Sequence, residues 1–572
     1  MSAPEAPLLP PAAATISKKQ RNKDARKAAK AEKAAQRQQQ HQQQPTSGSE
    51  AEAEEADPFA ASYGDVPDEE VQSTAVSGRS WTDVGALRAA AIGRSVLLRG
   101  AARSVAAHGS RLAFLVLRQG MDTVQCVVHA GPSVGPGMVR FAAALAAESV
   151  VDVEGVVAAP RDPVLRATAR HVEVRVTSIR CVARASRSLP FSLDDAAAEA
   201  EAELEGPGTG RASVGQDTRF NHRAFDLRTP ASQAIFRIQC QVENKFREFL
   251  LSKGFVGIHT PKLNAGASEG GASVFKLRYN GQPACLAQSP QLHEQMAISG
   301  GFGRVFEVGP VFRAENSKTP KHLCEFSGLD AEMEIKEHYF EVCNVIDGLL
   351  VAIFEHLNEN CRRELEEINK QFPFEPLKEA GTEVEPMGDL NTESERKLGQ
   401  LVKEKYGADF FILHRYPLAV RPFYTMPCYD NGAYSNSFDV FIRAKETFAD
   451  ATTGQEIISG AQRIHRPDLL AKRAAECGVD VSTISDYIES FRYGTPPHGG
   501  FGVGLERVVM LFCALKNIRM ASLFPRDPQR LRPQPPPPPP HLLRSRRALV
   551  VRYSDCPVCR TLYDRFSPCL VP

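Results

Sequence analysis

Hydrophobic residues follow a repeated strand pattern between about residues 90 and 185. Short β-branched or apolar segments alternate there with glycine, proline and charged residues. These segments are Ser95–Leu98, Leu112–Leu117, Thr123–Val128, Val150–Val157 and Val172–Val176. Several short strands at this spacing predict a small all-β barrel.

From residue 219 onward the hydrophobic period changes, and helical and strand patterns are mixed. Gln233–Lys253 is predicted to be an amphipathic helix. Its apolar face carries Ile235, Ile238, Val242, Phe246 and Phe249. Strand-like segments recur up to 502–512, without the regular strand–helix alternation of a parallel sheet. Residues 219–533 are therefore predicted to form an α+β domain with an antiparallel sheet.

Three stretches lack the hydrophobic pattern of packed helices or strands. Residues 1–75 contain a basic, alanine-rich part at 18–37 and an acidic part at Glu50–Glu55, so we expect a disordered extension. The extension is either a solubilising tail or a basic arm that neutralises nucleic-acid phosphates. Residues 186–218 are acidic and rich in glycine and alanine, which favours a hinge. Residues 534–572 form a proline- and arginine-rich tail, also expected to be disordered.

Composition narrows the class of protein. A chain of 572 residues with 42% hydrophobic content can form two to four domains. The chain has no apolar run long enough for a membrane span and no signal-peptide pattern, and its 13 cysteines are scattered, so we expect a cytoplasmic protein with reduced thiols. Cys556 and Cys559 lack a second pair at zinc-finger spacing and are interpreted as a chance pair.

Phosphate-binding loops of the common kinds are absent, because the sequence has neither a Walker loop nor a dinucleotide fingerprint. Gly309–Glu315, followed by His322–Asp330, offers another way to bind phosphate. The planar guanidinium of Arg313 suits a phosphate group. Glu315 can accept a hydrogen bond from an amino group, and Phe326 can stack on an aromatic ring.

Two further segments accompany this one. Gly502–Arg507 combines small residues, which let the backbone approach a ligand, with a second fixed cation at Arg507. Gly254–Pro261 directly follows the predicted helix and is a strand closed by proline. By itself it is an ordinary helix–strand unit.

In this order, Gly254–Pro261, the segment from Gly309 to Asp330, and Gly502–Arg507 resemble motifs 1, 2 and 3 of class II aminoacyl-tRNA synthetases. Other segments resemble aspartyl-tRNA synthetases of the eukaryotic cytosolic and archaeal type, from about residue 90 to Pro533. They are Ser268–Gly271, similar to the family's mobile loop, Gln288–Gln291, similar to its substrate strand, and the close matches Arg421–Pro427 and Ser459–His465.

The resemblance implies an aspartate–tRNA ligase, which makes aspartyl-adenylate from L-aspartate and ATP and transfers the aspartyl group to tRNA(Asp). It implies an OB-fold anticodon-binding barrel at 90–185, a class II catalytic domain at 219–533, and a homodimer assembled through motif 1. Assembly with other synthetases is left open. The alternatives are an asparaginyl-tRNA synthetase or a catalytically impaired variant that still binds tRNA.

The resemblance also assigns the site residues, with Arg313 and Arg507 as the catalytic pair. ATP is assigned to Arg313, Ala314, Glu315, Lys321, His322, Leu323, Phe326, Glu456, Gly504, Leu505, Glu506 and Arg507. Aspartate is assigned to Ser268, Glu269, Gln291, Leu292, His293, Glu294, Arg313, Asp330, Ser459 and Arg463. Mg²⁺ is assigned to Asp439 and Glu456. The anticodon is assigned to Phe114, Gln125 and Glu173.

The chain departs from the family pattern at several places. Glu294 stands where the family has a lysine that pairs with the substrate's side-chain carboxylate, and Phe501 stands where it has glycine, beside the motif 3 ligand surface. An arginine expected near Ala106 is missing. A segment is missing after Lys378, Thr447–Gln455 is inserted, and the chain continues beyond Pro533. These boundaries suggest an altered splice product or a mistaken gene model, which sequencing of the transcript would decide.

Overall fold

The computed structural model describes residues 57–197, 214–265, 274–314, 316, 319–373, 402, 410–444 and 453–533. Several predictions lie outside these residues. They concern the basic arm, the loop Ser268–Gly271, Glu315, the junction at Lys378, most of the insertion Thr447–Gln455, the tail and the Cys556–Cys559 pair.

The N-terminal body is a closed β-sheet, as the strand pattern predicted. Its strands are β1 (Tyr63–Asp65), β2 (Ser95–His108), β3 (Leu112–Gln119), β4 (Asp122–His129), β5 (Val150–Ala158) and β6 (Glu173–Ala183). They lie in the order β1-β6-β4-β3-β2-β5, and an additional pairing of β6 with β5 closes the sheet. Alternating apolar side chains fill the interior together with helix α3 (Pro136–Ala144).

Residues 57–75 are folded, so the prediction of disorder up to residue 75 was wrong for this part. Strand β1 pairs in parallel with β6, and helix α2 (Asp68–Val71) follows it. The hydroxyl of Tyr63 donates to Asp57 at 2.6 Å, and the Tyr63 ring lies 5.8 Å from that of Phe141. Pairing with β6 and the contacts of Tyr63 therefore hold a segment whose composition is otherwise that of a tail.

The C-terminal body is built on a seven-stranded sheet in the order β13-β14-β15-β16-β12-β11-β7. All neighbouring strands are antiparallel except β7 and β11, which confirms the predicted antiparallel character. The bounds are β7 (Val256–Gly257), β11 (Arg304–Phe312), β12 (Glu325–Glu334), β13 (Phe410–His414), β14 (Ser437–Ala444), β15 (Thr453–Gln462) and β16 (His498–Gly504). Strand β15 begins inside the inserted segment, so the end of the insertion is part of the sheet.

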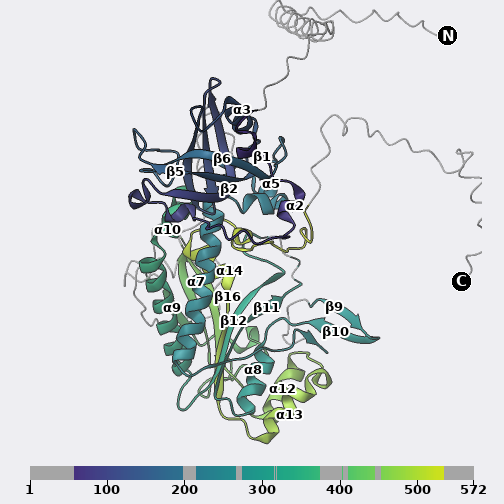
Figure 1. The fold of residues 1–572 in the computed structure, drawn as a ribbon. Coiled ribbons are helices and arrows are strands. Elements are labelled where there is room, and N and C mark those ends of the chain that lie inside the picture. The colour runs from purple at the N-terminus through teal and green to yellow at the C-terminus, as the bar shows by residue number, and fades with distance from the viewer. Residues whose placement is uncertain are drawn as a thin grey trace, which may run out of the picture.

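Helices cover the sheet, and Figure 1 shows the longest of them running along one side of it. This layer consists of α7 (Pro230–Ser252), α9 (Phe340–Asn360), α10 (Arg362–Gln371) and α14 (Leu505–Phe512). The predicted amphipathic helix is α7, and Ile235, Ile238, Val242 and Phe246 are fully buried in the main core. The remaining helices are α4 (Leu193–Ala196), α5 (Gln216–Asn221), α6 (Arg223–Asp226), α8 (Gln291–Ser299), α12 (Pro467–Glu476) and α13 (Ser485–Ser490).

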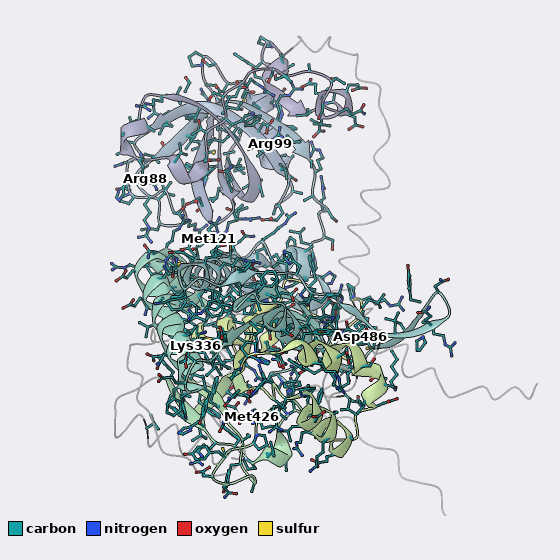
Figure 2. The ribbon with its side chains drawn as sticks, turned by 90° about the horizontal axis from the view of Figure 1, so that it is seen from below. Arg88, Arg99, Met121, Lys336, Met426 and Asp486 are labelled. Carbon is teal, nitrogen blue, oxygen red and sulfur yellow. The ribbon has the colours of Figure 1, made fainter. Side chains whose placement is uncertain are left out.

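A small sheet projects from the C-terminal body (Figure 1), formed by β8 (Leu263–Asn264), β9 (Lys276–Tyr279) and β10 (Gln282–Leu286). The barrel meets the C-terminal body near Met121, which Figure 2 labels and which belongs to the core cluster of the C-terminal body. At this junction the buried carboxylate of Glu148 pairs with Arg118 at 2.5 Å and with Arg228 at 2.8 Å. Among the described residues, no helix is long and apolar enough to cross a membrane.

Candidate active site

A cavity of about 430 Å³ lies on the central strands β12, β15 and β16. Most of the residues assigned to ATP and to aspartate border it. They are Gln291, Arg313, Lys321, His322, Leu323, Phe326, Asp330, Glu456, Ser459, Arg463, Gly504, Glu506 and Arg507. Segments more than 200 residues apart in the sequence therefore converge on one hollow, which brings together the segments that resemble motifs 2 and 3; Gly254–Pro261 does not border it.

Glycine residues on neighbouring strands form the floor of this cavity. Gly502 on β16 stands opposite Asp330 on β12. A Cβ atom added at Gly502 would lie 2.6 Å from Asp330 Oδ1 and 3.2 Å from Gln291 Nε2, and one at Gly328 would lie 2.6 Å from Asp330 Oδ2. The missing side chains thus leave the space that the Asp330 carboxylate occupies.

The end of the cavity near Gly504 carries cations and an aromatic ring. The Arg313 guanidinium lies 5.7 Å from the centre of the Phe326 ring. A Cβ atom at Gly504 would lie 3.7 Å from Arg507 Cβ and 3.9 Å from Phe326, so these two side chains flank the same floor position. With Lys321 also on the wall, this end suits a nucleotide whose base stacks and whose phosphates need positive charge.

Glu506 borders this end of the cavity, but its carboxylate already accepts hydrogen bonds from the protein. Its carboxylate accepts from the backbone N–H of Ser327 at 3.1 and 3.2 Å, which ties α14 to β12. Burial raises the pKa of Glu506 to about 7. Leu505 is buried in the core, and neither it nor Ala314 borders the cavity, so the structure gives these two residues no side-chain contact with it.

At the other end, a buried ion pair holds Arg463 in place. Its Nε donates to both oxygens of Glu332 at 3.1 and 3.2 Å, and its Nη2 donates to Oε2 at 3.1 Å. Burial raises the pKa of Glu332 to about 7, although Arg463 opposes that shift. The hydroxyl of Tyr424 donates to Gln291 Oε1 at 2.6 Å and so orients that amide. Neither Glu332 nor Tyr424 was predicted from the sequence.

Asp439, assigned to Mg²⁺, is engaged by a cation of the same chain. Both of its oxygens accept from Arg421, at 2.9 and 2.6 Å, and Arg421 also donates to Ser459 Oγ at 2.9 Å. Asp439 does not border the cavity, whereas Glu456 does. Ligation of a metal by Asp439 would therefore require the pair with Arg421 to open.

Helix α8 contributes only its first residue, Gln291, to the cavity. Leu292 packs in an apolar cluster with Phe423 and Tyr424, and His293 is half-buried. Glu294 has no exposed surface and does not border the cavity. Three of the four α8 residues assigned to aspartate thus lie behind the cavity wall.

Phe501 points away from the cavity. It is 1% exposed and belongs to the main core cluster, because side chains alternate along β16 and the neighbouring Gly502 faces Asp330. The expectation that Phe501 would lie beside the ligand surface is therefore wrong for its side chain.

A second hollow, of about 870 Å³, lies on the outside of the barrel. Phe114, Gln125 and Glu173 all border it, as does Ala106. Phe114 is half-buried, lies outside the barrel core and makes an edge contact with His108 at 5.5 Å. Gln125 Nε2 donates to Glu173 Oε2 at 3.0 Å. The three residues assigned to the anticodon thus share one surface, and Phe114 is not part of the barrel core.

Comparison with known proteins agrees with this geometry. The family model described as tRNA synthetases class II (D, K and N) matches residues 215–528. The cytoplasmic aspartate–tRNA ligase 2 of Arabidopsis thaliana is 57% identical over 513 residues, which cover 84% of this chain and 90% of that protein. Aspartyl tRNA synthetase from Entamoeba histolytica superposes with a TM-score of 0.73 at 42% identity, covering 82% of this chain and 96% of that one. Asparaginyl-tRNA synthetase from Pyrococcus horikoshii, solved with asparaginyl-adenylate, superposes with a TM-score of 0.66 at 29% identity, covering 79% of this chain and 100% of that one.

Proposed function

Since the chain belongs to the class II family of tRNA synthetases for D, K and N, we propose that it is an aspartate–tRNA ligase. It activates L-aspartate with ATP and transfers the aspartyl group to the 3′ end of tRNA(Asp). The observation that carries this proposal is one cavity that joins a cationic end at Arg313 and Arg507 to an end lined by Asp330 and Arg463, whose charges suit the ammonium and carboxylate groups of an amino acid. An asparagine substrate has less support, because the solved asparaginyl enzyme is 29% identical and the aspartyl enzyme 42%.

The reaction needs no nucleophile from the protein. The α-carboxylate of aspartate attacks the α-phosphorus of ATP, a new O–P bond forms, and the bond to pyrophosphate breaks. A hydroxyl of the terminal ribose of tRNA then attacks the activated carbonyl, and AMP leaves. Positioning of the two substrates and neutralisation of phosphate charge by Arg313 and Arg507 lower the barrier.

The two ends of the cavity have complementary roles in this scheme. Asp330 and the amide of Gln291, which Tyr424 orients, receive the substrate's ammonium group. Arg463 and Ser459 receive carboxylate. Phe326 stacks on the adenine ring. Two nitrogens of the Arg463 guanidinium donate hydrogen bonds to the Glu332 carboxylate. The Arg463 side chain is therefore already ordered before the substrate binds, which lowers the entropy cost of binding.

The proposed reaction also requires Mg²⁺, and the two carboxylates assigned to this ion fit it in part. Carboxylate oxygens are the ligands that Mg²⁺ prefers, and Glu456 borders the cavity beside Arg507, whose Nη1 donates to the Glu456 carbonyl at 3.2 Å. Glu456 would hold the ion, and Asp439 would join it only after release from Arg421. A bound Mg²⁺ would neutralise charge on the ATP oxygens.

For the barrel we propose an OB-fold that binds the anticodon. Its hollow presents a half-buried aromatic ring, Phe114, for stacking on a base. Gln125 and Glu173 offer an amide and a carboxylate for base edges. The arginine expected near Ala106 is missing from the sequence, while Arg161, Arg166 and Arg175 border the same hollow.

A homodimer through motif 1 is proposed on the edge strand β7. Val256 on this strand is 43% exposed, and Leu251 and Leu263 nearby in the sequence are also exposed. An apolar sheet edge of this kind is covered in a two-fold assembly. The cytoplasmic names of the relatives support a cytoplasmic location, while assembly with other synthetases stays a prediction.

Pyrophosphate exchange tests the proposal directly. Purified protein, ATP and labelled pyrophosphate are incubated with aspartate or with asparagine, and charging of tRNA(Asp) is measured in parallel. Exchange with aspartate supports the proposal. Exchange with asparagine alone would establish the second candidate, and binding of tRNA without exchange would establish a catalytically impaired variant.

A further inference from the structure

Glu294 is the buried ionisable group that the proposed mechanism leaves unused. It lies one turn into α8, three residues after Gln291, and has no exposed surface. Neither carboxyl oxygen has a hydrogen-bond partner in the described part of the chain. A carboxylate without partners is costly to bury, whereas a neutral carboxylic acid is much less so.

The charges around Glu294 are mainly negative. Asp330 and Glu332 on β12 and Glu307 on β11 act on it, and Arg463 is the cation that opposes them. Glu332 already binds Arg463, and Glu307 is paired with Lys262 at 2.9 Å. An ionised Glu294 would add one more negative charge to a group whose cations are already engaged.

The side chains of α13 and β16 that contact the neighbouring residue Gln295 carry no charge. Tyr487 on α13 and His498 on β16 both hydrogen bond to Gln295, the next residue, at 2.7 and 3.4 Å. Burial raises the pKa of Tyr487 far above its ordinary value and lowers that of His498 to about 3. Both side chains are therefore neutral at working pH. Burial, reinforced by Asp330 and the other carboxylates, raises the pKa of Glu294 well above its ordinary value.

We propose that Glu294 is a positioning residue for the amino-acid end of the cavity, and that aspartate binds only while Glu294 carries a proton. This inference rests on the proposed function. Glu294 does not touch the substrate, because it lies behind the cavity wall. Glu294 acts through Arg463. When Glu294 is neutral, the Arg463 guanidinium interacts with Glu332 and with the substrate carboxylate. An anionic Glu294 would compete for the same cation.

The direction in which the KM for aspartate changes with pH follows from the coupling between aspartate binding and protonation of Glu294. When only the protonated form binds, the KM for aspartate is constant below the pKa of Glu294. Above that pKa it rises about tenfold for each pH unit. The KM for ATP should not follow this profile, because the residues assigned to ATP lie at the other end of the cavity. A role in folding alone would not separate the two substrates.

The test compares the parent chain with Glu294→Gln, a neutral side chain of the same shape. Pyrophosphate exchange between pH 6 and 9 should give a rising KM for aspartate in the parent and a flat one in Glu294→Gln, with equal values at the acid end. Glu307→Gln is the matched control. It removes one of the carboxylates that act on Glu294 but leaves Glu294 able to ionise, so the KM for aspartate should still rise with pH in this variant, in contrast to Glu294→Gln.

A second measurement needs no variant. Calorimetry of aspartate binding to the parent chain, in buffers of different ionisation enthalpy, should show proton uptake that grows towards one per site as pH rises. Aspartate-dependent exchange with superimposed profiles for parent and Glu294→Gln, or binding without proton uptake up to pH 9, would overturn the inference alone. Exchange with asparagine and none with aspartate would instead remove the proposed function.

Discussion

Replacing Gly502 by alanine should weaken aspartate binding selectively. The new Cβ would lie 2.6 Å from Asp330 Oδ1 and 3.2 Å from Gln291 Nε2, and real Cβ atoms essentially never approach another atom to less than 3.0 Å. The carboxylate that receives the substrate's ammonium group must therefore move. Overpacking of this kind costs about 1–3 kcal/mol. At tenfold per roughly 1.4 kcal/mol, the KM for aspartate should rise between about 5-fold and 150-fold.

Gly504→Ala is the matched control on the same strand and the same side of the sheet. Its Cβ would meet nothing closer than 3.7 Å, which is ordinary van der Waals contact, and its neighbours are Arg507 and Phe326 at the ATP end. The KM for aspartate in this variant should stay within about twofold of the parent value. Any effect should appear in the KM for ATP.

Pyrophosphate exchange with each substrate varied in turn measures both constants, and a thermal melt shows whether each variant is folded. A Gly502→Ala enzyme with an unchanged KM for aspartate would refute the assignment of Asp330 to the ammonium group. An equal rise in the KM for aspartate and the KM for ATP, with an unchanged melting temperature, would also refute it, because the clash is confined to the amino-acid end.

Three further predictions concern ATP, the metal and the N-terminal extension. Arg507→Ala should reduce pyrophosphate exchange by about two orders of magnitude or more without lowering the melting temperature, as expected for the loss of one transition-state contact. Glu456→Gln should raise the Mg²⁺ concentration needed for half-maximal exchange more than Asp439→Asn does, because only Glu456 borders the cavity. Deleting residues 1–56 should flatten the salt dependence of tRNA binding, measured by filter binding, and leave exchange unchanged; an unaltered salt slope would make the extension a simple tail.

The sequence predicted those parts of the fold where a hydrophobic period is long. The barrel segments and the helix that became α7 have clear periods of two and 3.6 residues, and all of them begin within a few residues of the observed elements. Two predicted strands end too early, because β2 continues to His108 and β6 to Ala183. Strand β1 was missed because it has three residues and lies in a stretch of tail-like composition. It is folded through parallel pairing with β6 and the contacts of Tyr63, which no local pattern contains.

In the candidate site, the sequence could name side chains but not their partners. Arg463 was assigned from its segment, whereas its partner Glu332 lies 131 residues earlier and faces it only because β15, β16 and β12 are neighbours in the sheet. Arg421 likewise reaches Asp439 through the fold. Phe501 could have been placed correctly, because the glycines at 500, 502 and 504 lie on one side of an alternating strand.

The glycine floor of the cavity also bears on how the enzyme could escape an inhibitor. A compound lying on this floor would contact mainly main-chain atoms, whose positions no point mutation changes directly. Resistance there would require a residue that adds a side chain. At Gly502 and Gly328 that side chain would first meet the Asp330 carboxylate, on which the proposed binding of the natural substrate depends. Inhibitors that lie against these two glycines should therefore select for resistance mutations elsewhere, on the cavity walls.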